Sequence, residues 1–135
     1  MKTLLAHFYN HFEWLYLNPS YRLTDSSTDG NATVHAHLRV TGPLLSFSLT
    51  NDRGDLSHAI ARTASPGPER WFRVSIVRQH LEGLEDETAI SAADAANWLS
   101  DNLETIEGLF VDDVLARSCE QMSALMRASA ERRFG

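Results

Sequence analysis

The hydrophobic residues near the start of the chain recur at steps of three and four positions, which is the spacing of a helix with one apolar face. This pattern predicts a helix over residues 3–17. Its end is expected at Asn18-Pro19, because the residue before a proline is disfavoured in the α region. The apolar stripe consists of Leu4, Leu5, Phe8, Phe12 and Leu15.

The pattern then changes to a period of two, in which apolar and polar residues alternate. Such alternation is typical of antiparallel strands with one buried face. Strands are expected at residues 21–24, 32–40, 45–50, 55–62 and 71–81. The segments between them carry turn residues, and in Asn51-Asp52-Arg53-Gly54 the glycine supplies a positive φ. Turns are therefore expected at residues 25–31, 41–43, 51–54 and 63–69.

The last third of the chain returns to helical spacing. Ser91 and Asp94 form an imperfect capping box at the start of one helix, and Gly108 lies where that helix is expected to end. Asp112 or Asp113 is expected to cap a final helix. The two apolar stripes are Ala95, Trp98, Leu99, Leu103 and Ile106, and Leu115, Cys119, Met122, Leu125 and Met126.

Segregated strands and helices predict an α+β fold rather than a parallel α/β fold. We expect an N-terminal helix, an antiparallel β-meander of four to five strands and two C-terminal helices packed on one face of the sheet. The chain has 135 residues, of which 43% are hydrophobic. This is enough for one buried core, so residues 1–135 are expected to form a single domain.

Composition narrows the class of protein. The single cysteine, Cys119, excludes an internal disulfide and a cysteine-based zinc site, and its place on an apolar stripe favours a buried thiol. No apolar run approaches the roughly 20 residues of a membrane span, and polar residues after Leu5 interrupt any signal-peptide core. We therefore expect a cytoplasmic protein. Eleven of the twelve basic residues are arginine, which suggests a GC-rich bacterial genome.

The negative charge is concentrated in one segment. Between Arg78 and Arg117 the chain has ten acidic residues and no lysine or arginine, so this acidic segment carries −10. The whole chain carries −6, so the rest of it carries +4. A negative field of this kind repels nucleic acid and anionic membranes and steers basic partners. The acids are Glu82, Glu85, Asp86, Glu87, Asp94, Asp101, Glu104, Glu107, Asp112 and Asp113.

Histidines offer the first alternative chemistry. His7 and His11 have the i, i+4 spacing of two metal ligands on one helix face. A metal site needs a third ligand, and no HExxH-type context accompanies the pair, so we interpret them as structural and expect no metal or cofactor. The segment from Asp25 to Gly30 imitates the start of a calcium loop. Its twelfth position is Ala36 rather than glutamate, which excludes that interpretation.

The polar face of the expected sheet offers the second alternative. His35 and His37 lie on one face of a strand, and Ser46 and Ser48 extend that face on the next strand. Serine and histidine alone do not make a catalytic set, because an orienting acid and an oxyanion hole are also required. No phosphate loop, nucleophile elbow or CxxC is present. We therefore predict no catalytic residue.

These observations favour a protein-binding module over an enzyme. A small, acidic, cytoplasmic domain without a catalytic signature resembles, in class only, a bacterial immunity protein or antitoxin that neutralises a toxin with a basic surface. Nucleic acid and membranes are excluded as partners by the same charge. The predicted partner-binding residues are Glu85, Asp86, Glu87, Asp94, Asp101, Glu104, Glu107, Asp52 and Asp55.

Three alternatives remain open at the level of sequence. One is a small enzyme or a metal- or ligand-binding domain that uses the polar sheet face. Another is an acidic secretion chaperone, although such chaperones place more strand after the middle helix. The third is a homo-oligomer that packs through the last helix, with Met122, Leu125, Met126 and Phe134 between subunits.

Overall fold

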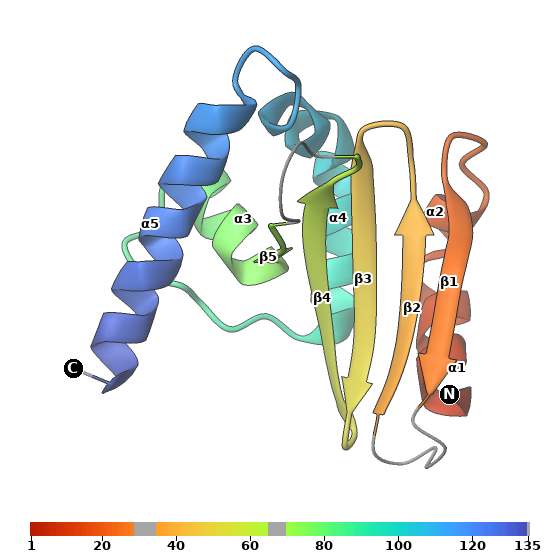
Figure 1. The fold of residues 1–135 in the computed structure, drawn as a ribbon. Helices are drawn as coiled ribbons and strands as arrows, with labels where there is room; N and C mark the ends of the chain where they lie inside the picture. Colours follow the sequence, from red (N-terminus) through yellow and green to blue (C-terminus); the bar gives the residue numbers. More distant parts are fainter. Residues whose placement is uncertain (29–34, 65–69, 135) are drawn as a thin grey trace.

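The computed structural model describes residues 1–28, 35–64 and 70–134. The strands are β1 (Arg22–Thr28), β2 (His35–Thr41), β3 (Leu45–Asp52), β4 (Asp55–Arg62) and β5 (Phe72–Arg73). The helices are α1 (Lys2–His11), α2 (Glu13–Tyr16), α3 (Val74–Glu82), α4 (Ala92–Leu109) and α5 (Leu115–Phe134). The strands form one antiparallel sheet in chain order (Figure 1). The predicted α+β fold is confirmed.

The N-terminal helix lies against the sheet with most of the predicted stripe buried. The helix is interrupted at Phe12, which has a non-helical φ of −118°, and α2 then ends before Asn18 as predicted. Leu5 is the exception in the stripe, since it is 45% exposed while His7 is buried. At 100° per residue Leu5 lies on the edge of the face that Leu4 and His7 share, so the histidine takes the core position.

The alternating strands also follow the prediction. Ala36, Leu38 and Val40 of β2 are buried, and their polar neighbours are more exposed. The hairpin between β3 and β4 turns through Arg53 and Gly54, both with positive φ. In contrast to the prediction, β1 continues to Thr28, because residues 25–28 extend the pairing with β2. Residues 29–31 of the turn predicted at 25–31, residues 32–34 of the strand predicted at 32–40 and residues 65–69 of the loop predicted at 63–69 lie outside the described residues.

The long strand predicted at residues 71–81 is wrong. Only Phe72 and Arg73 pair with β4, and residues 74–82 form α3. Gly83 ends that helix in the left-handed conformation, with φ 67°. Val74 and Ile76 alternate like strand residues, but Val77 is buried as well, and all three fit one face of a helix.

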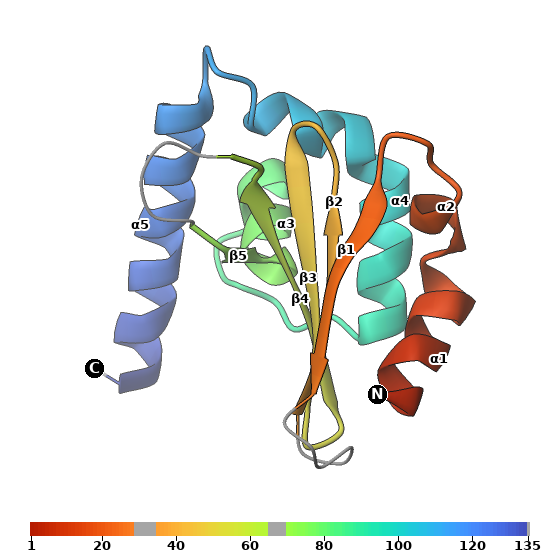
Figure 2. The same ribbon diagram turned by 45° about the vertical axis from the view of Figure 1, so that its right-hand side comes forward.

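Helices α1, α2 and α4 lie on one face of the sheet, and α5 stands apart from them beyond the β5 edge (Figures 1 and 2). α1 packs against β2 and β3, α4 packs against β4, and α5 lies beyond β5 against α3. Ser91 caps α4 by accepting a hydrogen bond from the Asp94 amide at 3.1 Å, as predicted. One hydrophobic core joins all of these elements, and the predicted stripe residues Cys119 and Met122 of α5 are buried within it.

Gly42 allows the close approach that attaches β1 to the core. A Cβ at this position would lie 2.4 Å from the ring of Tyr21, which is itself buried. Gly42→Ala should therefore displace the ring and lower the free energy of unfolding by about 1–3 kcal/mol. Urea unfolding would measure this. Gly108→Ala is the control, because a Cβ there meets no neighbouring atom and alanine in helix α4 should raise the free energy of unfolding by about 0.5–1 kcal/mol. A Gly42→Ala variant as stable as the wild type would mean that the ring moves aside without cost.

Candidate partner-binding surface

Helix α4 presents part of the acidic segment to the outside. Its apolar stripe faces the sheet, and Ala95, Leu99 and Ile106 are buried. Asp94, Asp101 and Glu104 lie on the opposite side and are exposed. Among the described residues none of these three carboxylates has a cationic partner. Their negative charge is therefore available to a binding partner.

A shallow groove of about 490 Å³ runs along this exposed side. Asp94 and Asp101 lie on its lining two helical turns apart, which is about 10 Å along the axis. Trp98 lies between them and, with Ile90, gives the groove an apolar surface. Arg78 also lines it, but its guanidinium donates to Glu82 at 3.1 Å, so the groove keeps a net negative charge.

Glu107 is placed differently from the other acids of α4. It is half-buried, and the Tyr21 hydroxyl donates a hydrogen bond to its carboxylate at 2.9 Å. Burial, together with this hydrogen bond and the charge of Glu107, raises the pKa of Tyr21. The carboxylate thus ties α4 to the start of the sheet and is less available to a partner.

The loop between α3 and α4 carries the other predicted acids. Glu85 is exposed and has no ionic partner among the described residues. Asp86 forms an ion pair with Arg132 of α5, whose guanidinium also donates to the Glu85 carbonyl at 3.2 Å. This part of the segment is held against α5, whereas α4 presents its acids outward.

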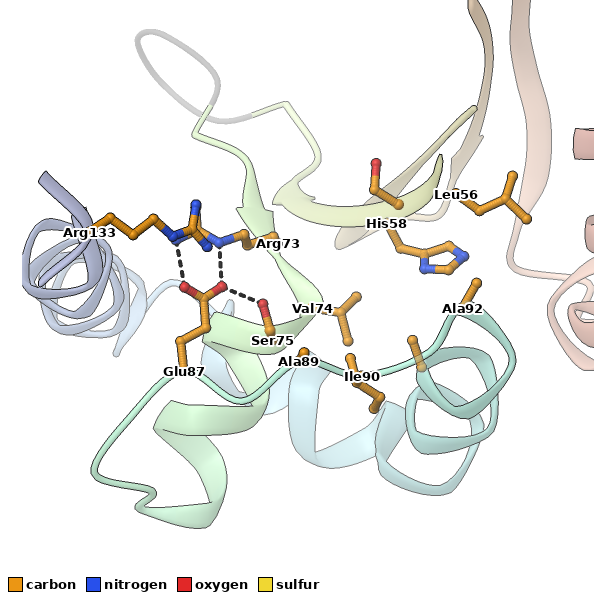
Figure 3. Close-up of a pocket in the computed structure, with 12 residues that line it drawn as sticks. Leu56, His58, Arg73, Val74, Ser75, Glu87, Ala89, Ile90, Ala92 and Arg133 are labelled. Atoms are coloured by element: carbon orange, nitrogen blue, oxygen red, sulfur yellow. Dashed lines mark hydrogen bonds and ion pairs between the residues drawn. The ribbon is translucent and has the colours of Figure 1, made fainter. Parts of the chain in front are cut away.

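Glu87 is enclosed within the protein, with only 8% of its side chain exposed. Arg73 donates to both carboxylate oxygens, including a 2.8 Å bond from Nη2, as Figure 3 shows. Ser75 and Ser129 also donate to it, the latter at 2.6 Å. The hydrogen bonds from Arg73, and then those from the two serines, lower the pKa of Glu87 to about 2. This carboxylate joins β5, α3 and α5, and its acceptor positions are occupied within the chain.

A cavity of about 370 Å³ lies beside this network (Figure 3). It is bounded by β4 and by the starts of α3 and α4, with Leu56, Val74 and Ile90 among its apolar lining. Its lining also includes the ion pair of Arg73 with Glu87. These two charges compensate each other, so they present no free charge to a ligand.

The two predicted acids outside the acidic segment lie apart from α4. Asp52 and Asp55 are exposed and face each other as a register pair at the tip of the β3–β4 hairpin. This tip projects beyond the end of α4 (Figure 1). The structure therefore gives these two residues a place separate from the groove.

The polar sheet face faces away from the helix layer, as predicted. His37 and Ser48 are hydrogen-bonded through Nε2 and Oγ at 3.0 Å. The guanidinium of Arg39 lies 5.2 Å from the centre of the Trp71 ring, so tryptophan from the segment before β5 reaches across this face. Within the described residues no carboxylate bonds to His37, so this serine and histidine lack the orienting acid that catalysis requires.

His7 is paired with a histidine that the sequence did not single out. Its Nε2 lies 2.9 Å from Nε2 of His58 on β4, and both side chains are buried. Burial, and secondarily the charge of His11, lowers the pKa of His7, and burial, and secondarily the charge of His7, lowers the pKa of His58 to about 4. The ring of His11 lies 5.1 Å from that of His7. Because His58 occupies the sheet position beneath α1, His35 and His37 on the opposite face do not join this pair.

The described residues contain neither a cluster of metal ligands nor a helix that could span a membrane. No group of three or more histidine, cysteine, aspartate or glutamate side chains there is arranged to hold a metal ion. Among the same residues, no helix combines the length and the apolar character needed to cross a membrane.

Comparison of the chain with protein-family models, curated proteins and solved structures finds no match.

Proposed function

We propose that this chain is a protein-binding module that recognises a basic protein surface through the groove on α4. The observation that carries the proposal is the pair Asp94 and Asp101, exposed and without a cationic partner among the described residues, on either side of Trp98. A partner arginine or lysine would lie over the indole ring and bond to a carboxylate. Glu104 and Glu85 would add to the field that steers the partner.

The class of protein that fits this mode is a bacterial immunity protein or antitoxin acting in the cytoplasm, with a toxin as the basic partner. Such a protein needs no catalytic residue, only a surface that covers the partner. A large multidomain toxin encoded next to this chain would support the assignment. A neighbouring metabolic operon would favour the ligand-binding alternative instead.

The test compares two variants with equal charge changes. Asp94→Asn/Asp101→Asn removes both groove carboxylates, and Glu120→Gln/Glu131→Gln removes two exposed carboxylates of α5. The partner is first taken as the protein that the wild-type chain retains from extracts of its source cells. We expect the groove variant to slow association with it about tenfold at low salt and the control to stay within about twofold. Equal effects of the two variants, or none, would remove the groove from the function.

A further inference from the structure

Exposed hydrophobic side chains gather on one side of the molecule instead of being scattered singly over its surface. Six large hydrophobic residues are exposed in the part of the chain that the structure describes, and five of them line one groove of about 460 Å³. Tyr9, Tyr16 and Leu17 are more than 60% exposed. A concentration of this kind marks an interaction surface. The five residues are Leu5, Tyr9, Tyr16, Leu17 and Leu23, and together they are called the N-terminal groove.

The free edge of the sheet lies next to this groove. β1 is the first strand in the sheet order, and among the described residues it pairs only with β2, so one side of its backbone has no strand partner there. All seven of its residues are exposed. Leu23 belongs to both features, because it is part of β1 and lines the groove. A single partner can therefore pair with the strand and cover the apolar side chains.

We propose that a second copy of this chain occupies this surface and forms a two-fold dimer through β1. An antiparallel strand edge is complementary to itself, and a two-fold axis perpendicular to the sheet would continue it as one sheet of two copies. That axis places both helix layers on the same face of the joined sheet, one on each side of the seam. The two N-terminal grooves then face each other and bury their apolar side chains together.

The charges on β1 fit the same arrangement. The register between β1 and β2 shifts after Leu23, so Arg22 pairs with Thr41 and Asp25 pairs with Arg39. Thr41 and Arg39 lie on the polar face of the sheet, so Arg22 and Asp25 share that face. If the two-fold axis passes midway between Arg22 and Asp25 along the strand, Arg22 of each copy lies opposite Asp25 of the other, so the seam contains two such pairs. Opposite charges across neighbouring strands stabilise their pairing, and like charges oppose it.

The charge pair gives a test in which a variant that restores opposite charges separates loss of the dimer from loss of the fold. In the wild-type chain, light scattering and sedimentation over a dilution series should show a dimer. Arg22→Asp or Asp25→Arg alone places like charges across the seam and should weaken the dimer about tenfold. The double variant Arg22→Asp/Asp25→Arg restores opposite charges and should return the dissociation constant to within about threefold of wild type.

The apolar part of the interface is tested separately. Tyr9→Ser/Leu17→Ser should give a monomer with an unchanged circular dichroism spectrum, because both side chains are exposed. Val111→Ser serves as the control, since Val111 is an exposed hydrophobic residue outside the groove. A wild-type chain that stays monomeric up to about 1 mM would overturn the proposal. So would a dimer that none of the β1 and groove variants weakens.

Discussion

Replacing Glu87 with alanine should lower the free energy of unfolding by about 3 kcal/mol, because the change leaves a partly buried arginine without its counter-ion. The carboxylate accepts hydrogen bonds from Arg73, Ser75 and Ser129, which lie on three different elements. Arg73 keeps 39% of its side chain exposed and can turn toward water, which places the expected loss at the lower end for a buried ion pair. Urea unfolding monitored by circular dichroism would measure the change.

The acidic segment provides a matched control two residues away. Glu85 is exposed and has no ionic partner in the described part of the chain, so Glu85→Ala should change stability by no more than about 0.5 kcal/mol. Both variants raise the net charge by one, so a general charge effect cancels in the comparison. If Glu87→Ala were as stable as Glu85→Ala, the network around Glu87 would contribute nothing to the fold.

This pair of residues also shows where sequence reasoning stops. Glu85 and Glu87 lie in the same short acidic run, and nothing local distinguishes them. What separates them is Arg73 and Ser129, which lie 14 and 42 residues away along the chain. The sequence therefore predicted the charge of the segment, but only the tertiary contacts separate the carboxylates that hold the fold from those that remain exposed.

The fold itself was predictable where one face of an element is buried and the other is not. β2 and α4 have this character, and the periods of two and 3.6 identified both. The prediction for the segment after β5 fails because Val74 and Ile76 alternate like strand residues, while Val74 and Val77 also fit a helix. Gly83 was the signal that favoured the helix, since a glycine directly after such a segment is a common helix C-cap.

His58 was overlooked although its position carried a signal. It lies two residues before Ile60 on β4, and strand residues two apart share a face, so it belongs to the buried side of the sheet. His7 is likewise three residues after Leu4 on the buried face of α1. The sequence could place each histidine inside, but not show that the two meet, because their contact spans 51 residues.

The buried histidine pair should make the fold sensitive to mild acid. His58 binds a proton with a pKa of about 4 in the folded chain, below its ordinary value of 6.5, because burial and the adjacent His7 disfavour its charged form. The unfolded chain therefore takes up a proton between these values that the folded chain does not. The contribution of His58 is fully present above pH 6.5 and is lost as the pH falls toward 4. His7, whose pKa is also lowered, acts in the same direction.

The expected loss from His58 is about 2 kcal/mol between about pH 7 and about pH 4.5, measured as the free energy of unfolding in urea. His58→Gln keeps a hydrogen-bonding side chain next to His7 without a titrating ring, so it should remove most of this dependence, whereas His35→Gln at an exposed position should keep it. Glu87 does not interfere, because its lowered pKa confines its own loss to pH values below 4.5. A pH dependence that survives undiminished in His58→Gln would show that other groups carry it, and the link between this contact and acid stability would then be wrong.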